Sequence, residues 1–257
     1  MSSREEKLSI VEQSPAAVAA HDKRKWLALF ASDGIVNDPV GSDIHQGPEQ
    51  LGRFYDTFIA PNDVVFHPKH DIVCGSTVVR DLELEIRMTD RVILIVPMHL
   101  RYELTDDDHV RGLYAHWELP TMVAQFGRKG FWALPSSLRL SARLLKNQGM
   151  SGSLGFARGF KRVGAAGKKT AAQFLDAVNG SDDSRLAAFA DVNVTWGAQR
   201  VQGAATLRGK LEGAAASKFI SAGDYVTVSL SDGDRHAVAM CEFSDGTLTD
   251  ATVYLEE

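Results

Sequence analysis

The chain has 257 residues, of which 44% are apolar, 24% charged and 8% aromatic, so it is long enough for one large globular domain or two small ones. Its two cysteines, Cys74 and Cys241, are isolated, which excludes a disulfide framework and a cysteine-rich zinc site. The formal charge of −5 is unevenly distributed, because residues 122–169 contain ten Lys or Arg and no Asp or Glu.

The N-terminal segment begins with MSSREEKLSIVEQ and has no apolar core of signal-peptide length. Nowhere do about 18 apolar residues run together, so we expect neither secretion nor a membrane span and place the protein in the cytoplasm. Apolar spacing predicts helices over residues 4–20 and 23–31. Within the first, Ser14-Pro15 is typical of a helix cap followed by a first-turn proline, so a kink or break is expected there.

The pattern of elements then occurs twice. A short strand at Ile35-Val36, a helix over 48–58 and β-rich runs over 70–119 are followed later by helices over 169–190 and 204–214 and by strands from 217 to the end. Short sequence repeats support this duplication: LALFA at 27–31 recurs as LAAFA at 186–190, and Gln46-Gly47 recurs as Gln202-Gly203. We therefore predict two copies of one α+β domain, over residues 1–122 and 168–257, joined by a basic helical connector over 123–167.

The segment 27–55, LALFASDGIVNDPVGSDIHQGPEQLGRFY, resembles the Δ5-3-ketosteroid isomerase family without a gap. The most specific part is Asp38-Pro39-Val40-Gly41-Ser42, followed by Gly47 and Phe54-Tyr55. A weaker likeness extends over residues 14–118, and the second copy resembles only the general fold. The resemblance implies two NTF2-like (cystatin-like), or SnoaL-like, cone domains, each a curved antiparallel sheet wrapped around helices.

That family resemblance also implies an activity. In a steroid Δ5-Δ4 isomerase of this type, Asp38 would remove a proton next to a carbonyl and return it two carbons away, on a small hydrophobic, steroid-like ligand. The mechanism is the general one described for ketosteroid isomerase, with hydrogen-bond donors around the developing oxyanion. No metal or organic cofactor is implied.

The usual oxyanion donors of the family are replaced in this chain: the resemblance places Ser14 where the family has a tyrosine and His99 where it has an aspartic acid. His99 would donate a hydrogen bond, or would be charged and pair with Asp38, or would be a core histidine; Tyr55 would reach the substrate oxygen or serve structure. Strand alternation places Ile95, Pro97, His99 and Arg101 on one face, and we expect this face to line the pocket. The expected substrate-binding residues are Phe54, Pro97, Arg101, Leu113, Ala115 and Trp117.

The second copy has Trp196-Gly197 where Asp38-Pro39 would fall, so we expect it to be non-catalytic. It would supply the partner face of an intramolecular pseudo-dimer, with further oligomerisation left open. Two alternatives to an isomerase remain: a non-catalytic binder of a steroid or lipid, and a lyase or hydratase in which Asp38 and His99 act as an acid–base pair.

The connector combines apolar and basic side chains at helical spacing. Leu138, Ala142 and Leu145 form an apolar strip beside Arg139, Arg143 and Lys146, and a second stretch sets Phe156, Phe160 and Val163 against Arg158, Lys161 and Arg162. Such helices over 128–169 suit peripheral contact with an anionic membrane. In the alternative, they pack on the two domains while Phe131 and Trp132 close the pocket mouth. No recognition motif for nucleic acid accompanies the charge, so nucleic acid is not an expected partner.

Overall fold

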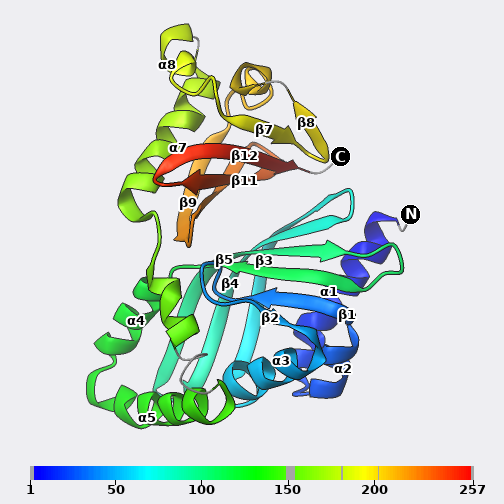
Figure 1. Cartoon of the computed structure of the whole chain (residues 1–257), viewed down its shortest axis with the longest axis vertical. Helices are drawn as coiled ribbons and strands as arrows, with labels where there is room; N and C mark the ends of the chain where they lie inside the picture. Colours follow the sequence, from blue (N-terminus) through cyan, green and yellow to red (C-terminus); the bar gives the residue numbers. More distant parts are fainter. Residues whose placement is uncertain (1–2, 149–153, 181, 202, 256–257) are drawn as a thin grey trace.

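A computed structural model describes residues 3–148, 154–180, 182–201 and 203–255. It contains two six-stranded sheets, in the orders β2-β1-β6-β5-β4-β3 and β8-β7-β12-β11-β10-β9. Figure 1 shows the second sheet lying over the first, with α1, α2 and α3 on the far side of the first sheet. The two orders are identical when the strands are numbered within each half, which confirms the predicted tandem pair of α+β cone domains.

The first domain opens with helices and closes with a meander of long strands. Its helical segments are α1 (Arg4–Ala19), α2 (Lys23–Ala28), α3 (Gly47–Phe54) and the π-helical η1 (Tyr55–Ile59). Its strands are β1 (Phe30–Asn37), β2 (His45–Gln46), β3 (Asp63–Cys74), β4 (Thr77–Thr89), β5 (Val92–Leu104) and β6 (Val110–His116).

The second domain repeats this order with shorter elements. Its helical segments are α7 (Gly164–Asn179), α8 (Asp183–Ala187) and the 3-10 turn η5 (Ala204–Leu207). Its strands are β7 (Asn193–Trp196), β8 (Gln199–Val201), β9 (Ala215–Ala222), β10 (Tyr225–Asp232), β11 (Arg235–Ser244) and β12 (Thr247–Leu255).

The connector is helical, as expected. It contains α4 (Leu119–Arg128), η2 (Gly130–Ala133), α5 (Leu134–Arg143), η3 (Leu144–Gln148) and η4 (Arg158–Phe160). Both expected domain limits, at residues 122 and 168, fall inside helices, in α4 and α7 respectively, so the division of the chain at those residues stays a prediction. Within the described ranges every helix is too short or too polar to cross a membrane.

Three details of the secondary structure correct the sequence analysis. The sheets are mixed rather than antiparallel, because the first strand of each domain joins the last one in parallel, β1 with β6 and β7 with β12. Helix α1 continues through Pro15 instead of starting or breaking there. The helix predicted over 204–214 is only the turn η5, because Gly203, Gly209 and Gly213 take positive φ angles that a helix does not allow.

The two domains meet through the outer faces of their sheets. Ile72, Cys74 and Val79 of the first domain form a small buried cluster with Val238, Met240 and Tyr254 of the second. Beside it, the rings of His70 and His236 stack with centroids 3.4 Å apart. This is the face-to-face contact expected of an intramolecular pair.

A buried polar network crosses the same interface. The Lys218 ammonium donates to a carboxylate oxygen of Asp81 and to the backbone carbonyls of Leu82 and Met98, the last at 2.9 Å. The Ser229 hydroxyl donates to the other Asp81 oxygen at 2.5 Å. Burial of Asp81 opposes ionisation, but the nearby His99 ring and the hydrogen bonds from Lys218 and Ser229 outweigh it and hold the pKa of Asp81 well below its usual range.

Removing one partner of this buried pair should destabilise the fold strongly. Lys218→Ala leaves the Asp81 carboxylate buried without its cation, which should cost about 3–5 kcal/mol of unfolding free energy. The measurement is urea unfolding at neutral pH. The exposed Lys169→Ala is the matched control, with an expected change within about 0.5 kcal/mol.

The double variant Asp81→Asn/Lys218→Met tests the cause. It removes both charges at once, so it should recover part of the loss seen in Lys218→Ala. Equal stabilities for Lys218→Ala and Lys169→Ala would contradict the assignment of this ion pair to the interface.

Candidate functional site

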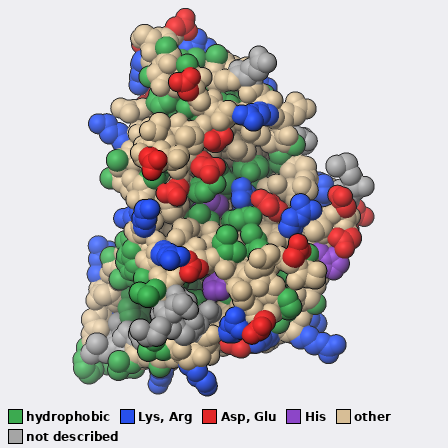
Figure 2. Space-filling view, viewed as in Figure 1, with side chains coloured by type: hydrophobic (Ala, Val, Ile, Leu, Met, Phe, Trp, Pro, Cys, Tyr) green, Lys and Arg blue, Asp and Glu red, His purple; other side chains and the backbone are tan. Residues whose placement is uncertain are grey.

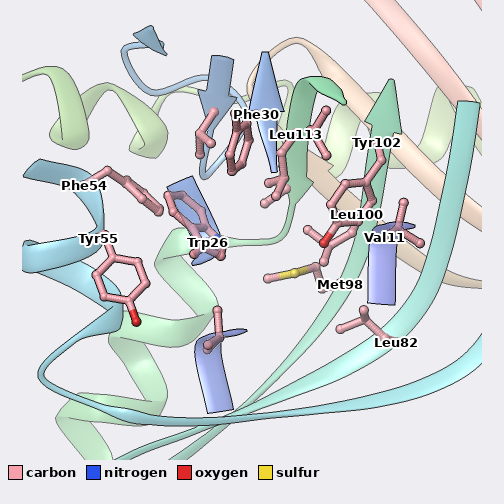
Figure 3. Close-up of a cluster of buried hydrophobic side chains, with 14 of the residues drawn as sticks. Val11, Trp26, Phe30, Phe54, Tyr55, Leu82, Met98, Leu100, Tyr102 and Leu113 are labelled. Atoms are coloured by element: carbon pink, nitrogen blue, oxygen red, sulfur yellow. The ribbon is translucent and has the colours of Figure 1, made fainter. Parts of the chain in front are cut away.

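A cavity of about 210 Å³ lies in the first domain, between its helices and the inner face of its sheet. Its wall is almost wholly apolar. Figure 3 shows Trp26 and Phe54 on one side of the cluster and Met98, Leu100 and Tyr102 of β5 on the other. The polar or ionisable side chains among the lining residues are Ser14, Asp38, Asn62 and Tyr102, together with the indole N–H groups of Trp26 and Trp117.

Asp38 brings the one carboxylate of the described lining into this cavity. It directly follows strand β1, where the backbone N–H of Val40 bonds to the Ala115 carbonyl at 2.9 Å and the Asn37 amide bonds to the Ser42 carbonyl at 2.9 Å. These bonds fix the loop that carries Asp38. The indole N–H of Trp117 donates to the Asp38 carboxylate at 2.6 Å.

The surroundings of Asp38 change its acidity. Burial raises the pKa of the Asp38 carboxyl to about 6, and the hydrogen bond from Trp117 offsets part of this rise. A carboxylate that accepts few hydrogen bonds in an apolar wall has a raised pKa, because its charged form is poorly stabilised there. Near neutral pH, Asp38 is therefore deprotonated and able to take a proton.

Tyr102 is a second polar group of the cavity, and the sequence analysis did not select it. Its side chain is fully buried and lines the pocket, and its hydroxyl has no hydrogen-bond partner by geometry within the described residues. Burial raises the pKa of the Tyr102 phenol, and the neighbouring Ser14 hydroxyl partly offsets this. A neutral phenol with an unused donor can bind a ligand oxygen.

Ser14 also lines the cavity. Its hydroxyl accepts a hydrogen bond from the Trp26 indole at 3.2 Å. The family resemblance has a tyrosine at this position of the first helix, whereas this chain has the small hydroxyl of Ser14. Tyr102, on strand β5, lines the same cavity.

Three of the expected binding residues line the cavity: Phe54, Leu113 and Trp117. Ala115 is buried and helps to hold the Asp38 loop through its carbonyl, but it is not part of the lining. Tyr55 is also outside the lining; its ring packs against Trp26, with centroids 5.5 Å apart. Its hydroxyl is buried without a hydrogen-bond partner in the described part of the chain.

His99 lies on the opposite face of the sheet from the cavity, which corrects the expectation for β5. Its two ring nitrogens contact the hydroxyl oxygens of Thr227 at 2.7 Å and Ser229 at 2.9 Å, both in the second domain. Burial lowers the pKa of His99, although Asp81 opposes this. The structure therefore does not bring His99 to Asp38, either as an oxyanion donor or as the partner of an acid–base pair.

The alternation predicted for β5 is present, but the assignment of its two faces was reversed. Pro97 is exposed and Arg101 lies over the Tyr114 ring at 4.2 Å, both outside the cavity lining. Val96, Met98, Leu100 and Tyr102 line it instead. Three apolar residues in this second set were the sequence signal that could have identified the face of an apolar pocket.

Comparison with protein-family models identifies the type of the first domain. Residues 11–112 match the family model described as a SnoaL-like domain. The first domain is a SnoaL-like domain. A search among curated proteins gave no match.

The search of solved structures found similar chains, each of which matches a little under half of this chain. A Δ5-3-ketosteroid isomerase from Mycobacterium sp. is 24% identical, with 45% of this chain and 95% of that chain covered and a TM-score of 0.43. A Mycobacterium tuberculosis protein solved with estradiol-17beta-hemisuccinate is 24% identical, with 45% of this chain and 95% of that chain covered and a TM-score of 0.42. A putative SnoaL-like polyketide cyclase from Shewanella putrefaciens is 15% identical, with 48% of this chain and 96% of that chain covered and a TM-score of 0.44.

The connector contributes six side chains to the cavity of the SnoaL-like domain: Leu119, Met122, Val123, Phe126, Leu140 and Phe156. None of them was expected there from the sequence. Phe156 stacks on Phe58 with ring centroids 5.2 Å apart. The two aromatic residues expected to close the mouth do not: Phe131 is 78% exposed and Trp132 is 53% exposed.

The second domain has no carboxylate at the place corresponding to Asp38. Strand β7 ends at Trp196, whose ring lies under the Lys210 ammonium at 4.8 Å, and Gly197 follows. Neither side chain can take a proton. This supports the expectation that the base belongs to the SnoaL-like domain alone.

The raised pKa of Asp38 predicts a measurable effect on stability. The folded chain holds the Asp38 proton up to a pH of about 6, whereas an ordinary aspartic acid loses it near 3.8, so stability falls as pH rises across this window. Asp38→Asn removes the buried charge and should raise the unfolding free energy at neutral pH by about 1–3 kcal/mol.

Urea unfolding measured over a pH series checks this. The gain from Asp38→Asn should disappear at pH values below the ordinary aspartic acid pKa, where both chains are uncharged at this position. The exposed Asp33→Asn is the control and should leave stability nearly unchanged. A wild-type chain as stable as Asp38→Asn at every pH would show that Asp38 is not desolvated.

Proposed function

We propose that the SnoaL-like domain is an isomerase that moves a carbon–carbon double bond into conjugation with a carbonyl, on an apolar polycyclic ketone such as a 3-oxo-Δ5-steroid. The observation that carries the proposal is a single basic carboxylate, Asp38, in an otherwise apolar cavity, with a pKa of about 6. A general base works best when its pKa lies near the working pH.

The proposed reaction has two proton transfers. The Asp38 carboxylate takes a proton from the carbon between the carbonyl and the double bond, and the electron pair moves toward the carbonyl oxygen, giving a dienolate. Asp38 then returns the same proton to the far carbon of the dienolate, which yields the conjugated ketone. The reaction consumes no other reagent.

The dienolate oxygen needs a donor, and Tyr102 is the group we propose for it. Its phenol is neutral and buried, and its hydroxyl makes no hydrogen bond to the described residues. A donor that is held in place before the reaction stabilises developing charge without further reorganisation. Tyr102 thus takes the role for which Tyr55 and His99 were considered.

Asp38→Asn should abolish turnover while leaving ligand binding intact. A carboxamide cannot take the proton, so kcat should fall by several orders of magnitude, on the order of 10⁴-fold or more. The assay follows the absorbance of the conjugated product, and binding is measured separately by quenching of tryptophan fluorescence. Asp33→Asn is the matched control.

The wild-type pH profile provides an independent check. Because Asp38 acts in its deprotonated form, kcat/KM should rise with pH and level off above an inflection near 6. An active Asp38→Asn chain, or a profile that is flat across this range, would contradict the assignment of the base.

Tyr102→Phe should lower kcat by about 10²- to 10³-fold with little change in KM, as expected for the loss of one oxyanion donor. Its stability should not fall, because the variant removes a buried hydroxyl that lacks a partner. The control is Tyr114→Phe, which removes a phenol outside the cavity lining. Equal activity of the two variants would exclude Tyr102 as the donor.

A non-catalytic binder of a steroid or lipid is the second candidate. The observation in its favour is that two polar groups of the lining already have partners in the protein. The Asn62 amide donates to the Phe58 carbonyl at 2.8 Å, and the Ser14 hydroxyl accepts from the Trp26 indole. Few polar groups therefore remain for chemistry. Tight binding of a 3-oxo-Δ5-steroid without any formation of the conjugated isomer would favour this alternative.

A further inference from the structure

The connector carries a surface that neither domain covers. The apolar strip predicted on the sequence is exposed along its length: Leu138 is 71% exposed, Leu145 is 53% exposed and Ala142 is also exposed. Phe131 and Trp132 lie before it on η2, with their rings in edge contact at 6.2 Å. We call Phe131, Trp132, Leu138, Ala142 and Leu145, together with the basic residues beside them, the connector surface.

The basic residues of this surface are not neutralised by the protein. Arg128, Arg139 and Lys146 are exposed, and in the part of the chain that the structure describes they make no salt bridge. Arg91, from the turn between β4 and β5, adds a further cation over the Trp132 ring at 3.7 Å. Figure 2 shows hydrophobic and basic side chains gathered at the lower left of the molecule, where α4 and α5 lie in Figure 1.

The second basic stretch of the connector behaves differently. Arg158 pairs with Asp43 at 2.6 Å, and Arg162 pairs with Glu118 at 3.3 Å. Lys168, on α7 of the second domain, also pairs with Glu118, at 2.6 Å. The charges of Arg158 and Arg162 are used to attach the connector to the SnoaL-like domain. Two of the three basic residues of the second stretch therefore have acidic partners, whereas Arg128, Arg139 and Lys146 of the connector surface have none among the residues described.

We propose that the connector surface docks on an anionic phospholipid membrane, from which the apolar ligand enters the cavity. Exposed aromatic and aliphatic side chains surrounded by cations suit the interface of a bilayer that carries anionic headgroups. The same segment reaches the cavity: Leu140 on α5 and Phe126 on α4 line it, while Leu138 and Phe131 face out. The ligand class rests on the proposed function; the docking itself does not.

Vesicle co-sedimentation of the full chain tests the proposal. The chain should bind phosphatidylcholine vesicles that contain phosphatidylglycerol and should bind pure phosphatidylcholine vesicles at least about tenfold more weakly. Phe131→Ser/Trp132→Ser should lower the partition coefficient by about tenfold or more, as should Arg139→Glu/Lys146→Glu. The charge-matched control is Lys25→Glu/Lys210→Glu, at exposed positions outside the connector, which should bind as wild type does.

Two further measurements guard against misfolded variants and separate this proposal from the proposed function. Tryptophan emission should shift to the blue when anionic vesicles are added, and Trp132→Phe should lose the shift while still binding. Asp38→Asn should bind vesicles normally, so a failed isomerase assay leaves this test intact. A wild-type chain that stays in the supernatant with anionic vesicles, or connector variants that bind like the control, would overturn the proposal. So would binding to duplex DNA in place of vesicles.

Discussion

Strand β5 is the constraint on which both the cavity and the domain contact depend. Successive side chains of a strand point to opposite faces, so β5 must satisfy two environments at once. Val96, Met98 and Leu100 face the cavity, whereas His99 faces the second domain and contacts Thr227 and Ser229. A shift of one residue would exchange these sets, placing a histidine in the apolar wall and aliphatic side chains against buried hydroxyls. The pairing of His99 with Thr227 and Ser229 therefore stabilises the register that builds the cavity.

This separation also sets the chemistry of Asp38. A protonated histidine or an arginine in the cavity would stabilise the carboxylate and lower its pKa, which would make it a weaker base. Asp81 of β4 and His99 of β5 lie instead at the domain interface, where Asp81, Lys218 and Ser229 satisfy one another. Asp38 is left with the Trp117 indole, so burial dominates and its pKa rises to about 6.

The sequence predicted the residues of the site that are placed by local sequence patterns, but not those that are placed by tertiary packing. Asp38 and Phe54 were predicted from the family-like segment 27–55, and Leu113 and Trp117 from alternation along the last strand and their family positions. All four line the cavity. The alternation of β5 was also predicted, but a period of two gives two faces without saying which one is inside. The family position of His99 indicated one face of β5, whereas the apolar residues of the other face mark the side that lines the cavity. Connector residues such as Leu140 could not be placed, because helical spacing does not say which part of a strip a distant domain covers.

The second domain affects the site although it has no base of its own. Gly41, in the loop that carries Asp38, and Gly223, between β9 and β10, approach so closely that a Cβ on Gly41 would lie 2.5 Å from the Cα of Gly223. Both have positive φ angles, so glycine is required at each for its conformation as well as for space. The loop is thus held on one side by the bond from Val40 to Ala115 and on the other by the second domain. In the proposed isomerase reaction, Asp38 moves a proton between two carbons, so its loop has to be held in place, and the second domain contributes to that support.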